Sequence, residues 1–131
     1  MTEEINNVIN NDKGFIKSNN FKINKLGKDD CTLEYEIKKD GLNPYGIVHG
    51  GVLFGLADTA AGLLAAMNEK TVVTMNSSFN FINPTKEGKL FAISRIIKDG
   101  KTVGFYEVKI VDENDKIIAN ALINMYNKKI S

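Results

Sequence analysis

The sequence predicts an α+β protein in which one curved antiparallel β-sheet wraps around a single long central helix. Two observations predict this class: an uninterrupted apolar segment of helical length at residues 50–67, and strand-like segments both before and after it. Short connections join antiparallel neighbours. A helix that is apolar on nearly every side has to be enclosed, and a single sheet can enclose it by curling. A second copy of the chain is expected to cover the outer face of that sheet.

The strands are predicted from periodicity and from their turn signals. Residues 31–38 alternate strictly between apolar and polar side chains, which is typical of a half-buried strand. The other strands are expected at 21–26, 71–82, 89–98, 102–111 and 117–126. Asp99-Gly100 predicts a tight hairpin, while a longer connection is expected at 83–88 and a turn at 112–116.

The whole chain, residues 1–131, is expected to form one domain. Residues 1–20 are expected to be an N-terminal extension or a short helix, and that helix would lie at 2–10. Lys and Arg number 17 against 16 Asp and Glu, so the formal net charge is +1. That balance argues against a nucleic-acid partner, which requires a basic surface. The single cysteine, Cys31, excludes an internal disulfide, and the polar, acidic N-terminus is not a secretory signal. We therefore expect a cytoplasmic protein.

The apolar helix has to be weighed as a membrane span. The 18 residues at 50–67 are at the short limit for crossing a bilayer. Asp58 near the centre would cost roughly 2.5–3.5 kcal/mol there on insertion scales. The segment is therefore expected to be a core helix and no membrane partner is expected. Within that core, Asp58 is expected to be buried, and a buried unpaired carboxylate is neutralised, paired or functional.

The start of the helix carries a second group of informative residues. Gly50 and Gly51 are expected in its first turn, where backbone N–H groups have no partner within the helix. Those donors and the positive end of the helix dipole suit an oxyanion or a polarised carbonyl. Alone, the two glycines are better explained by a tight turn, and His49 by a role as a cap or a loop-packing residue. Together with Asp58 they indicate a site.

His49 and Asp58 are nine residues apart. In one helix they would be about 13–14 Å apart along the axis and on opposite faces. They therefore cannot hydrogen-bond to each other within one chain. A site that uses both residues has to be built across a subunit interface.

Residues 43–62, NPYGIVHGGVLFGLADTAAG, resemble the signature of the hot dog fold acyl-CoA thioesterases of the phenylacetate-degradation type. In that family an Asn, a Gly and a His-Gly-Gly precede an acid inside the central helix. The segments NFINPTKEGKLFA and KDGKTVGFYEVKI also resemble strands of the family, and the resemblance covers roughly residues 21–127. It implies a hot dog fold, homodimers or dimers of dimers, and two active sites at the dimer interface.

The resemblance implies hydrolysis of an acyl- or aryl-CoA thioester to the free acid and CoA. Asp58 of one subunit would act as general base on water or attack the thioester directly, and the Gly50 N–H of the other would polarise the carbonyl. Asn43 and His49 of that other subunit would orient the substrate or the leaving sulfur, and Thr74 would position water beside the acid. Substrate contacts are expected from Gly51, Val52, Leu53, Leu56, Phe79 and Phe81.

No metal or cofactor is expected, because one His, one Cys and scattered acids form no ligand cluster, and CoA enters only as part of the substrate. A thioester has a good leaving group, so a positioned base and an oxyanion donor are sufficient chemistry. Cys31 is expected in the core and not as a nucleophile. Two alternatives remain open: a hot dog module that binds acyl-CoA without turnover, and a hot dog enoyl-CoA hydratase or dehydratase.

Overall fold

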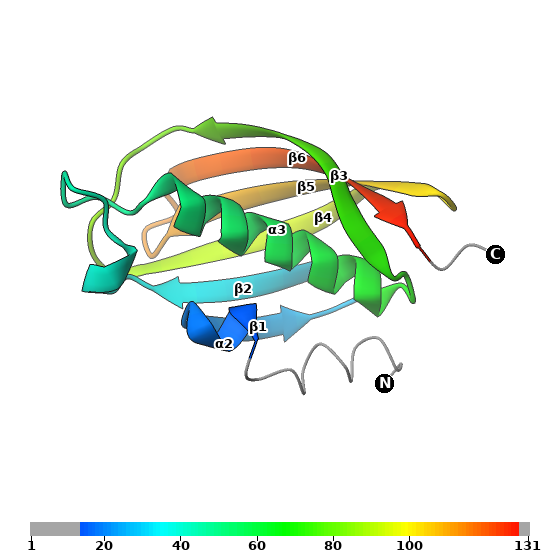
Figure 1. The fold of residues 1–131 in the computed structure, drawn as a ribbon, viewed down its shortest axis with the longest axis horizontal. Helices are drawn as coiled ribbons and strands as arrows, with labels where there is room; N and C mark the ends of the chain where they lie inside the picture. The colour runs from blue at the N-terminus through cyan, green and yellow to red at the C-terminus, as the bar shows by residue number, and fades with distance from the viewer. Residues whose placement is uncertain (1–13, 129–131) are drawn as a thin grey trace.

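The computed structural model describes residues 14–128 as a six-stranded antiparallel sheet with one long helix packed across it (Figure 1). Its elements are α2 (Phe15–Ser18), β1 (Phe21–Leu26), β2 (Asp30–Glu36), the 3-10 turn η1 (Lys39–Gly41), α3 (Gly50–Met67), β3 (Val72–Phe81), β4 (Lys89–Asp99), β5 (Val103–Asp112) and β6 (Ile117–Asn127). The strand order is β1-β2-β4-β5-β6-β3, and every neighbouring pair is antiparallel. The predicted fold class is confirmed.

The order of strands in the sheet departs from their order along the chain. Consecutive strands are neighbours in the pairs β1–β2, β4–β5 and β5–β6, but β3 does not pair with β4. Instead β3 pairs with β6 at one edge of the sheet, and β4 lies between β2 and β5. The connection at residues 82–88 is longer than a hairpin turn and carries the chain from that edge back to the middle of the sheet (Figure 1).

The ends of several elements differ slightly from the prediction. β2 ends at Glu36, because the Ile37 N–H turns to the carbonyl of Gly88, 2.8 Å away, rather than continuing the ladder. The turn after β5 is held by Asp112, whose Oδ1 accepts the N–H groups of Asn114 and Lys116 at 2.9 Å each. The short helix expected at 2–10 lies outside the described residues.

The core lies between α3 and the inner face of the sheet. Side chains that alternate along β2, β4, β5 and β6 point toward the helix and are almost fully buried. The hydroxyl of Ser94 is also buried there and donates to the carbonyl of Ala60 in α3 at 2.8 Å. Cys31 is fully buried, as expected, and burial raises the pKa of its thiol, which makes it a poor nucleophile.

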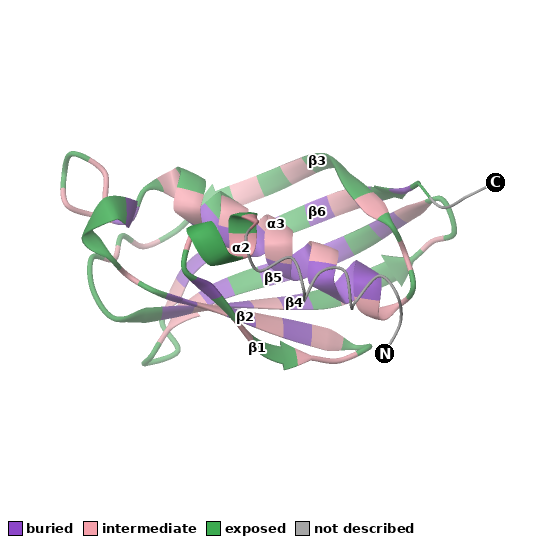
Figure 2. Cartoon of the chain, turned by 60° about the horizontal axis from the view of Figure 1, so that its bottom comes forward, coloured by how far each residue is buried: buried purple, intermediate pink, exposed green. Residues whose placement is uncertain are grey.

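The expectation that α3 is enclosed on all sides is wrong within one chain. Only one flank of the helix is buried against the sheet, and Figure 2 shows half-buried and exposed residues along both α3 and β3. Phe54 is 37% exposed, and a methyl group added at Gly62 would meet nothing within 4 Å. Among the described residues α3 is the one helix whose length and mean hydropathy of 1.5 suit a membrane span, and half of it is buried, as in the core helix of a folded domain.

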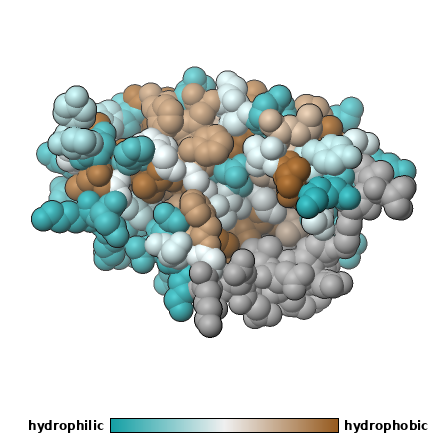
Figure 3. All heavy atoms as spheres, viewed as in Figure 1, coloured by the Kyte–Doolittle hydropathy of each residue, from teal (hydrophilic) through white to brown (hydrophobic). Residues whose placement is uncertain are grey.

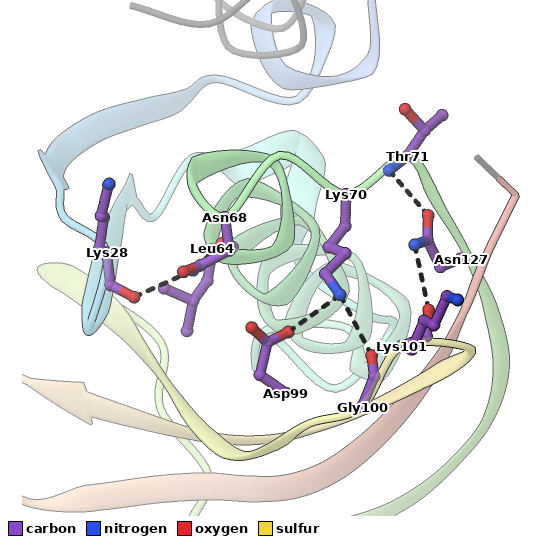
Figure 4. Close-up of polar contacts among 9 residues, drawn as sticks. All are labelled: Lys28, Leu64, Asn68, Lys70, Thr71, Asp99, Gly100, Lys101 and Asn127. Carbon is purple, nitrogen blue, oxygen red and sulfur yellow. Dashed lines mark hydrogen bonds and ion pairs between the residues drawn. The ribbon is translucent and has the colours of Figure 1, made fainter. Parts of the chain in front are cut away.

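A set of polar contacts closes the C-terminal end of α3 (Figure 4). Lys70 lies 3.5 Å from the carboxylate of Asp99 and donates to the Gly100 carbonyl at 3.2 Å, which ties the segment after the helix to the β4–β5 hairpin. Asn68 donates to the carbonyl of Lys28 in the β1–β2 turn at 3.0 Å. These contacts fix one end of the helix and leave its N-terminal half for the site.

Candidate active site

The loop before α3 is shaped by Asn43. Its side-chain Oδ1 accepts the N–H groups of Tyr45 at 2.9 Å and of Ile47 at 3.2 Å, which closes a tight loop. Gly46 in this loop has a φ of +79°, a conformation that favours glycine. The Val48 N–H then donates to the carbonyl of Thr85 at 2.9 Å, so the loop is anchored to the connection after β3.

The N-terminus of α3 presents one free backbone donor. His49 is the N-cap, and its Nδ1 accepts the Gly51 N–H at 2.8 Å. The N–H groups of Val52 and Leu53 donate to the His49 carbonyl, at 3.0 and 3.4 Å. Within residues 14–128 the Gly50 N–H donates to no protein acceptor. The cap therefore leaves this single N–H, at the positive end of the helix dipole, available to a ligand.

The cap also defines the state of His49. Because Nδ1 accepts a hydrogen bond, the ring N–H is on Nε2. The side chain is exposed, so this Nε2–H is available as a second donor beside the helix N-terminus. His49 is therefore both a structural cap and a polar group of the site.

A pocket of about 340 Å³ opens next to the Gly50 N–H. Its lining combines the loop before α3, the first turn of the helix and the connection after β3: Asn43, Ile47, Val48, Gly50, Leu53, Phe81, Ile82, Asn83, Pro84 and Thr85. The Phe81 ring lies over Gly50 so closely that a Cβ there would be 3.1 Å from the ring. The lining is largely apolar with a few polar groups, which is typical of a small-molecule site.

Asp58 and Thr74 form a second polar group, further along α3. The Thr74 hydroxyl, on β3, donates to Asp58 Oδ1 at 2.5 Å. The sequence predicts a fully buried carboxylate, but Asp58 is half-buried and Thr74 is exposed in this chain. The reason is that Asp58 lies on the flank of α3 that faces the edge strand β3, where the sheet ends. One carboxylate oxygen is held by Thr74, and the carboxylate remains accessible.

A row of aromatic rings separates the two polar groups. The ring centroids of Phe54 and Phe79 are 5.7 Å apart, and those of Phe79 and Phe81 are 4.6 Å apart. Phe81 reaches the pocket, and Phe54 lies one helical turn from Asp58. The rings form a continuous apolar surface between the helix N-terminus and the acid.

The residues proposed from sequence therefore fall in different places. Asn43, Gly50, Leu53 and Phe81 line the pocket, whereas Asp58 and Thr74 lie outside it. Other predicted contacts do not line it: Gly51 is exposed, Val52 packs at the edge of the core, and Leu56 is fully buried.

Other lining residues were not predicted from sequence. These are the residues of the connection after β3 and the two before His49: Ile82, Asn83, Pro84, Thr85, Ile47 and Val48. Their role depends on the long-range contact between Val48 and Thr85, for which the sequence carries no local signal. Within residues 14–128, no three His, Cys, Asp or Glu side chains are placed to hold a metal ion.

Comparisons with known proteins define the class of this chain. Residues 45–119 match the model of the thioesterase superfamily. A protein of Haemophilus influenzae, provisionally named as an esterase, is 30% identical over 72% of this chain and 71% of its own. A 1,4-dihydroxy-2-naphthoyl-CoA hydrolase of Listeria monocytogenes is 27% identical over 82% of this chain and 89% of its own.

Solved structures of similar proteins share the fold. The PaaI protein from the phenylacetic acid degradation operon of Escherichia coli superposes with a TM-score of 0.87 at 23% identity, covering 95% of this chain and 92% of that one. A Streptococcus mutans protein bound to acetyl-CoA gives 0.80 at 28% identity, covering 82% and 88%. An aspartate-to-alanine variant of a hypothetical thioesterase from Streptococcus pneumoniae gives 0.80 at 25%, covering 82% and 90%. A threonine-to-alanine variant of that protein gives 0.79 at 25%, covering 82% and 89%.

Fold and site together define a hot dog protein with a ligand pocket at the N-terminus of its central helix. The chain belongs to the thioesterase superfamily, and it is a thioester hydrolase.

Proposed function

We propose that this protein is an acyl-CoA thioesterase whose two active sites are each built from both subunits of a homodimer. The observation that carries the proposal is the pair of complementary groups on α3: a free N–H at Gly50 and an accessible carboxylate at Asp58. The first can stabilise negative charge on a carbonyl oxygen, and the second can accept a proton or form a bond to carbon. The proposal includes one domain over residues 1–131, a cytoplasmic location and no cofactor.

In the proposed reaction, the thioester carbonyl oxygen accepts a hydrogen bond from the Gly50 N–H of one subunit. Asp58 of the other subunit removes a proton from a water molecule, whose oxygen attacks the carbonyl carbon. The tetrahedral intermediate then breaks its C–S bond, and the CoA thiolate leaves and takes up a proton. In the alternative order, the Asp58 carboxylate attacks the carbonyl carbon first, the C–S bond breaks and the CoA thiolate leaves. Water then hydrolyses the resulting anhydride, which releases the acid and restores Asp58. Asn43 and the Nε2–H of His49, both close in sequence to the Gly50 N–H, would orient the thioester.

Two of the comparison structures support the assignment of Asp58 and Thr74. The variants of the Streptococcus pneumoniae thioesterase replace one aspartate and one threonine that are 16 positions apart. Asp58 and Thr74 are separated by the same interval, and they are joined by a hydrogen bond. Structures with acetyl-CoA and with coenzyme A among the neighbours support CoA as the carrier of the substrate.

The exposed apolar surface around α3 and β3 supports the dimer. Figure 3, which views this side of the molecule, shows hydrophobic side chains interspersed with polar ones. On β3, the exposed fractions reach 46% at Val73, 54% at Met75 and 60% at Phe81. β3 is also an edge strand, with one side of its backbone unpaired in the sheet. A second copy of the chain at this edge, or a dimer of dimers, covers the surface and brings Gly50 of one subunit toward Asp58 of the other.

The test is release of free thiol from acyl-CoAs that range from acetyl to palmitoyl and include phenylacetyl and hydroxybenzoyl. Asp58→Asn is expected to lower kcat by about 10²-fold or more, with the oligomer intact by sedimentation. Asp29→Asn, an exposed change in the β1–β2 turn, is the matched control and is expected to be fully active. Full activity of Asp58→Asn would refute the role of the acid. Binding of acyl-CoA without thiol release, or water addition to an enoyl-CoA, would favour the two alternative functions.

A further inference from the structure

Two amide side chains in the pocket have orientations that the backbone dictates. Asn43 Oδ1 accepts two backbone N–H groups, and only the oxygen of an amide can accept. Asn83 Nδ2 donates to the carbonyl of Ile117 at 2.7 Å, and only the nitrogen of an amide can donate. Asn43 therefore presents its NH₂ as the unused group, and Asn83 presents its oxygen.

The two unused groups belong to residues that line the pocket. Both asparagines are half-buried and line it. In the described part of the chain, the one buried side-chain nitrogen or oxygen without a partner is Ser77 Oγ, so neither Asn43 Nδ2 nor Asn83 Oδ1 is sealed from a ligand. The pocket thus offers two donors, Asn43 Nδ2 and the Gly50 N–H, and the acceptor Asn83 Oδ1. The Thr85 hydroxyl, which also lines it, can donate or accept.

The charge of the pocket restricts its ligand. Among residues 14–128, no Lys, Arg, His, Asp or Glu side chain lines it. The described lining therefore offers no counter-ion to a phosphate or carboxylate group, and the part of the substrate bound here is expected to be uncharged. A thioester carbonyl matches the two donors. The carbonyl oxygen cannot pair with Asn83 Oδ1, because both are acceptors. Asn83 Oδ1 therefore requires an N–H or O–H group of the ligand.

We propose that Asn83 is a substrate-binding residue whose Oδ1 accepts a hydrogen bond from an N–H or O–H group of the thioester substrate. The inference rests on the proposed acyl-CoA thioesterase function. The donor has two possible sources: an amide N–H of the pantetheine arm, or a hydroxyl on the acyl group. In either case the donor group is held near the carbonyl that the Gly50 N–H polarises. Asn83 therefore sets the affinity for the substrate and the discrimination between substrates with and without this donor.

The test pairs one variant with matched substrates. Asn83→Leu removes the oxygen at similar volume, and Asn80→Leu is the control, because Asn80 is an exposed residue of β3 that is hydrogen-bonded to Asn120 and does not line the pocket. For the acyl side, 4-hydroxybenzoyl-CoA is compared with benzoyl-CoA. For the thiol side, a benzoyl thioester of N-acetylcysteamine, which keeps one amide N–H, is compared with a benzoyl thioester of pentanethiol, which has none.

Asn83→Leu is expected to lower kcat/KM by about tenfold or more only for substrates that carry the donor. Loss of the hydroxybenzoyl preference assigns the donor to the acyl group. Loss of the N-acetylcysteamine preference, with the hydroxybenzoyl preference retained, assigns it to pantetheine. Equal losses for all four substrates, or no loss, would overturn the proposal.

Two outcomes need separate controls. If Asn83→Leu does not fold, the four substrates are compared on the wild-type protein alone. If neither the acyl hydroxyl nor the amide on the thiol side changes kcat/KM by about tenfold, the proposal is overturned. If the wild-type protein releases no thiol from any thioester, the proposed function fails. The same four compounds are then titrated calorimetrically against wild type and Asn83→Leu, and the difference in Kd replaces the difference in kcat/KM.

Discussion

A site shared between subunits predicts that two inactive variants restore each other when they are mixed. Gly50 and Asp58 are eight residues apart on α3, so they are separated by about 12 Å along its axis. The donor has to lie about 3 Å from the carbonyl oxygen, and the base about 3 Å from the water that attacks the carbon bonded to that oxygen. One helix cannot provide both groups to one thioester. Two helices related by a two-fold axis can.

The first variant removes the donor and little else. Gly50→Pro deletes the backbone N–H at the first helical position, where proline is well tolerated. The added ring atoms approach Phe81, since a Cβ at Gly50 would lie 3.1 Å from that ring. Gly50→Ala is therefore the control, because it adds the same Cβ and keeps the N–H. The loss from Gly50→Ala to Gly50→Pro measures the donor alone and is expected to be about 2.7–4 kcal/mol in the activation free energy.

The second variant is Asp58→Asn, and the expected recovery follows from counting sites. After subunit exchange in a 1:1 mixture, about half of the dimers contain one subunit of each kind. Each such dimer has one site with an intact Gly50 N–H and an intact Asp58, and one site with neither. The mixture is therefore expected to reach about one quarter of wild-type activity by thiol release. Subunit exchange is checked by mass spectrometry of differently tagged chains. Complete exchange without recovered activity would refute the shared site.

Three further changes test single interactions. His49→Ala removes the helix cap and is expected to lower the free energy of unfolding by about 0.5–2 kcal/mol, whereas His49→Asn keeps a capping oxygen and most of the stability; equal urea midpoints would contradict the cap. Thr74→Val removes the donor to Asp58 at nearly constant shape and is expected to lower kcat by about tenfold, with Thr74→Ser close to wild type. Burial, with a smaller contribution from the charge of Asp99, raises the pKa of Tyr106 to about 12. Between pH 10 and 12 the unfolded chain loses this proton while the folded chain keeps it. The free energy of unfolding should therefore fall as pH rises, by at most about 1.4 kcal/mol per pH unit. Tyr106→Phe should lack this component, and equal slopes of wild type and variant would refute it.

The elements with strong local signals could be predicted from the sequence. The helix limits at Gly50 and Met67 agree with the prediction, because a glycine pair and an N-cap mark its start and a polar segment follows its end. The hairpin at Asp99-Gly100 and the alternation along β2 depend on neighbouring residues alone, and they were predicted as well. Such features depend on residues that are close together in the sequence, so one sequence is sufficient to predict them.

The features that depend on distant pairings could not be predicted. That β3 lies beside β6 is decided by how the whole sheet closes, and a longer connection allows either choice. The same pairing places Asn83 beside Ile117 and so creates the acceptor in the pocket. The half-exposure of Asp58 follows too, because β3 is an edge strand. Each of these consequences rests on one long-range contact.

The composition of α3 indicates that both of its flanks are covered, one by the sheet and the other by a second subunit. The sheet covers one flank of the helix, and a flank in permanent contact with water would carry polar residues at helical spacing. The open flank instead carries Phe54 and Gly62, with Asp58 as the one ionisable side chain of the whole helix. A second subunit on this flank accounts for the apolar residues, and the N–H of its Gly50 gives the carboxylate a reacting partner. If sedimentation found a monomer at every concentration, both the apolar flank and the placement of Asp58 would require a different explanation.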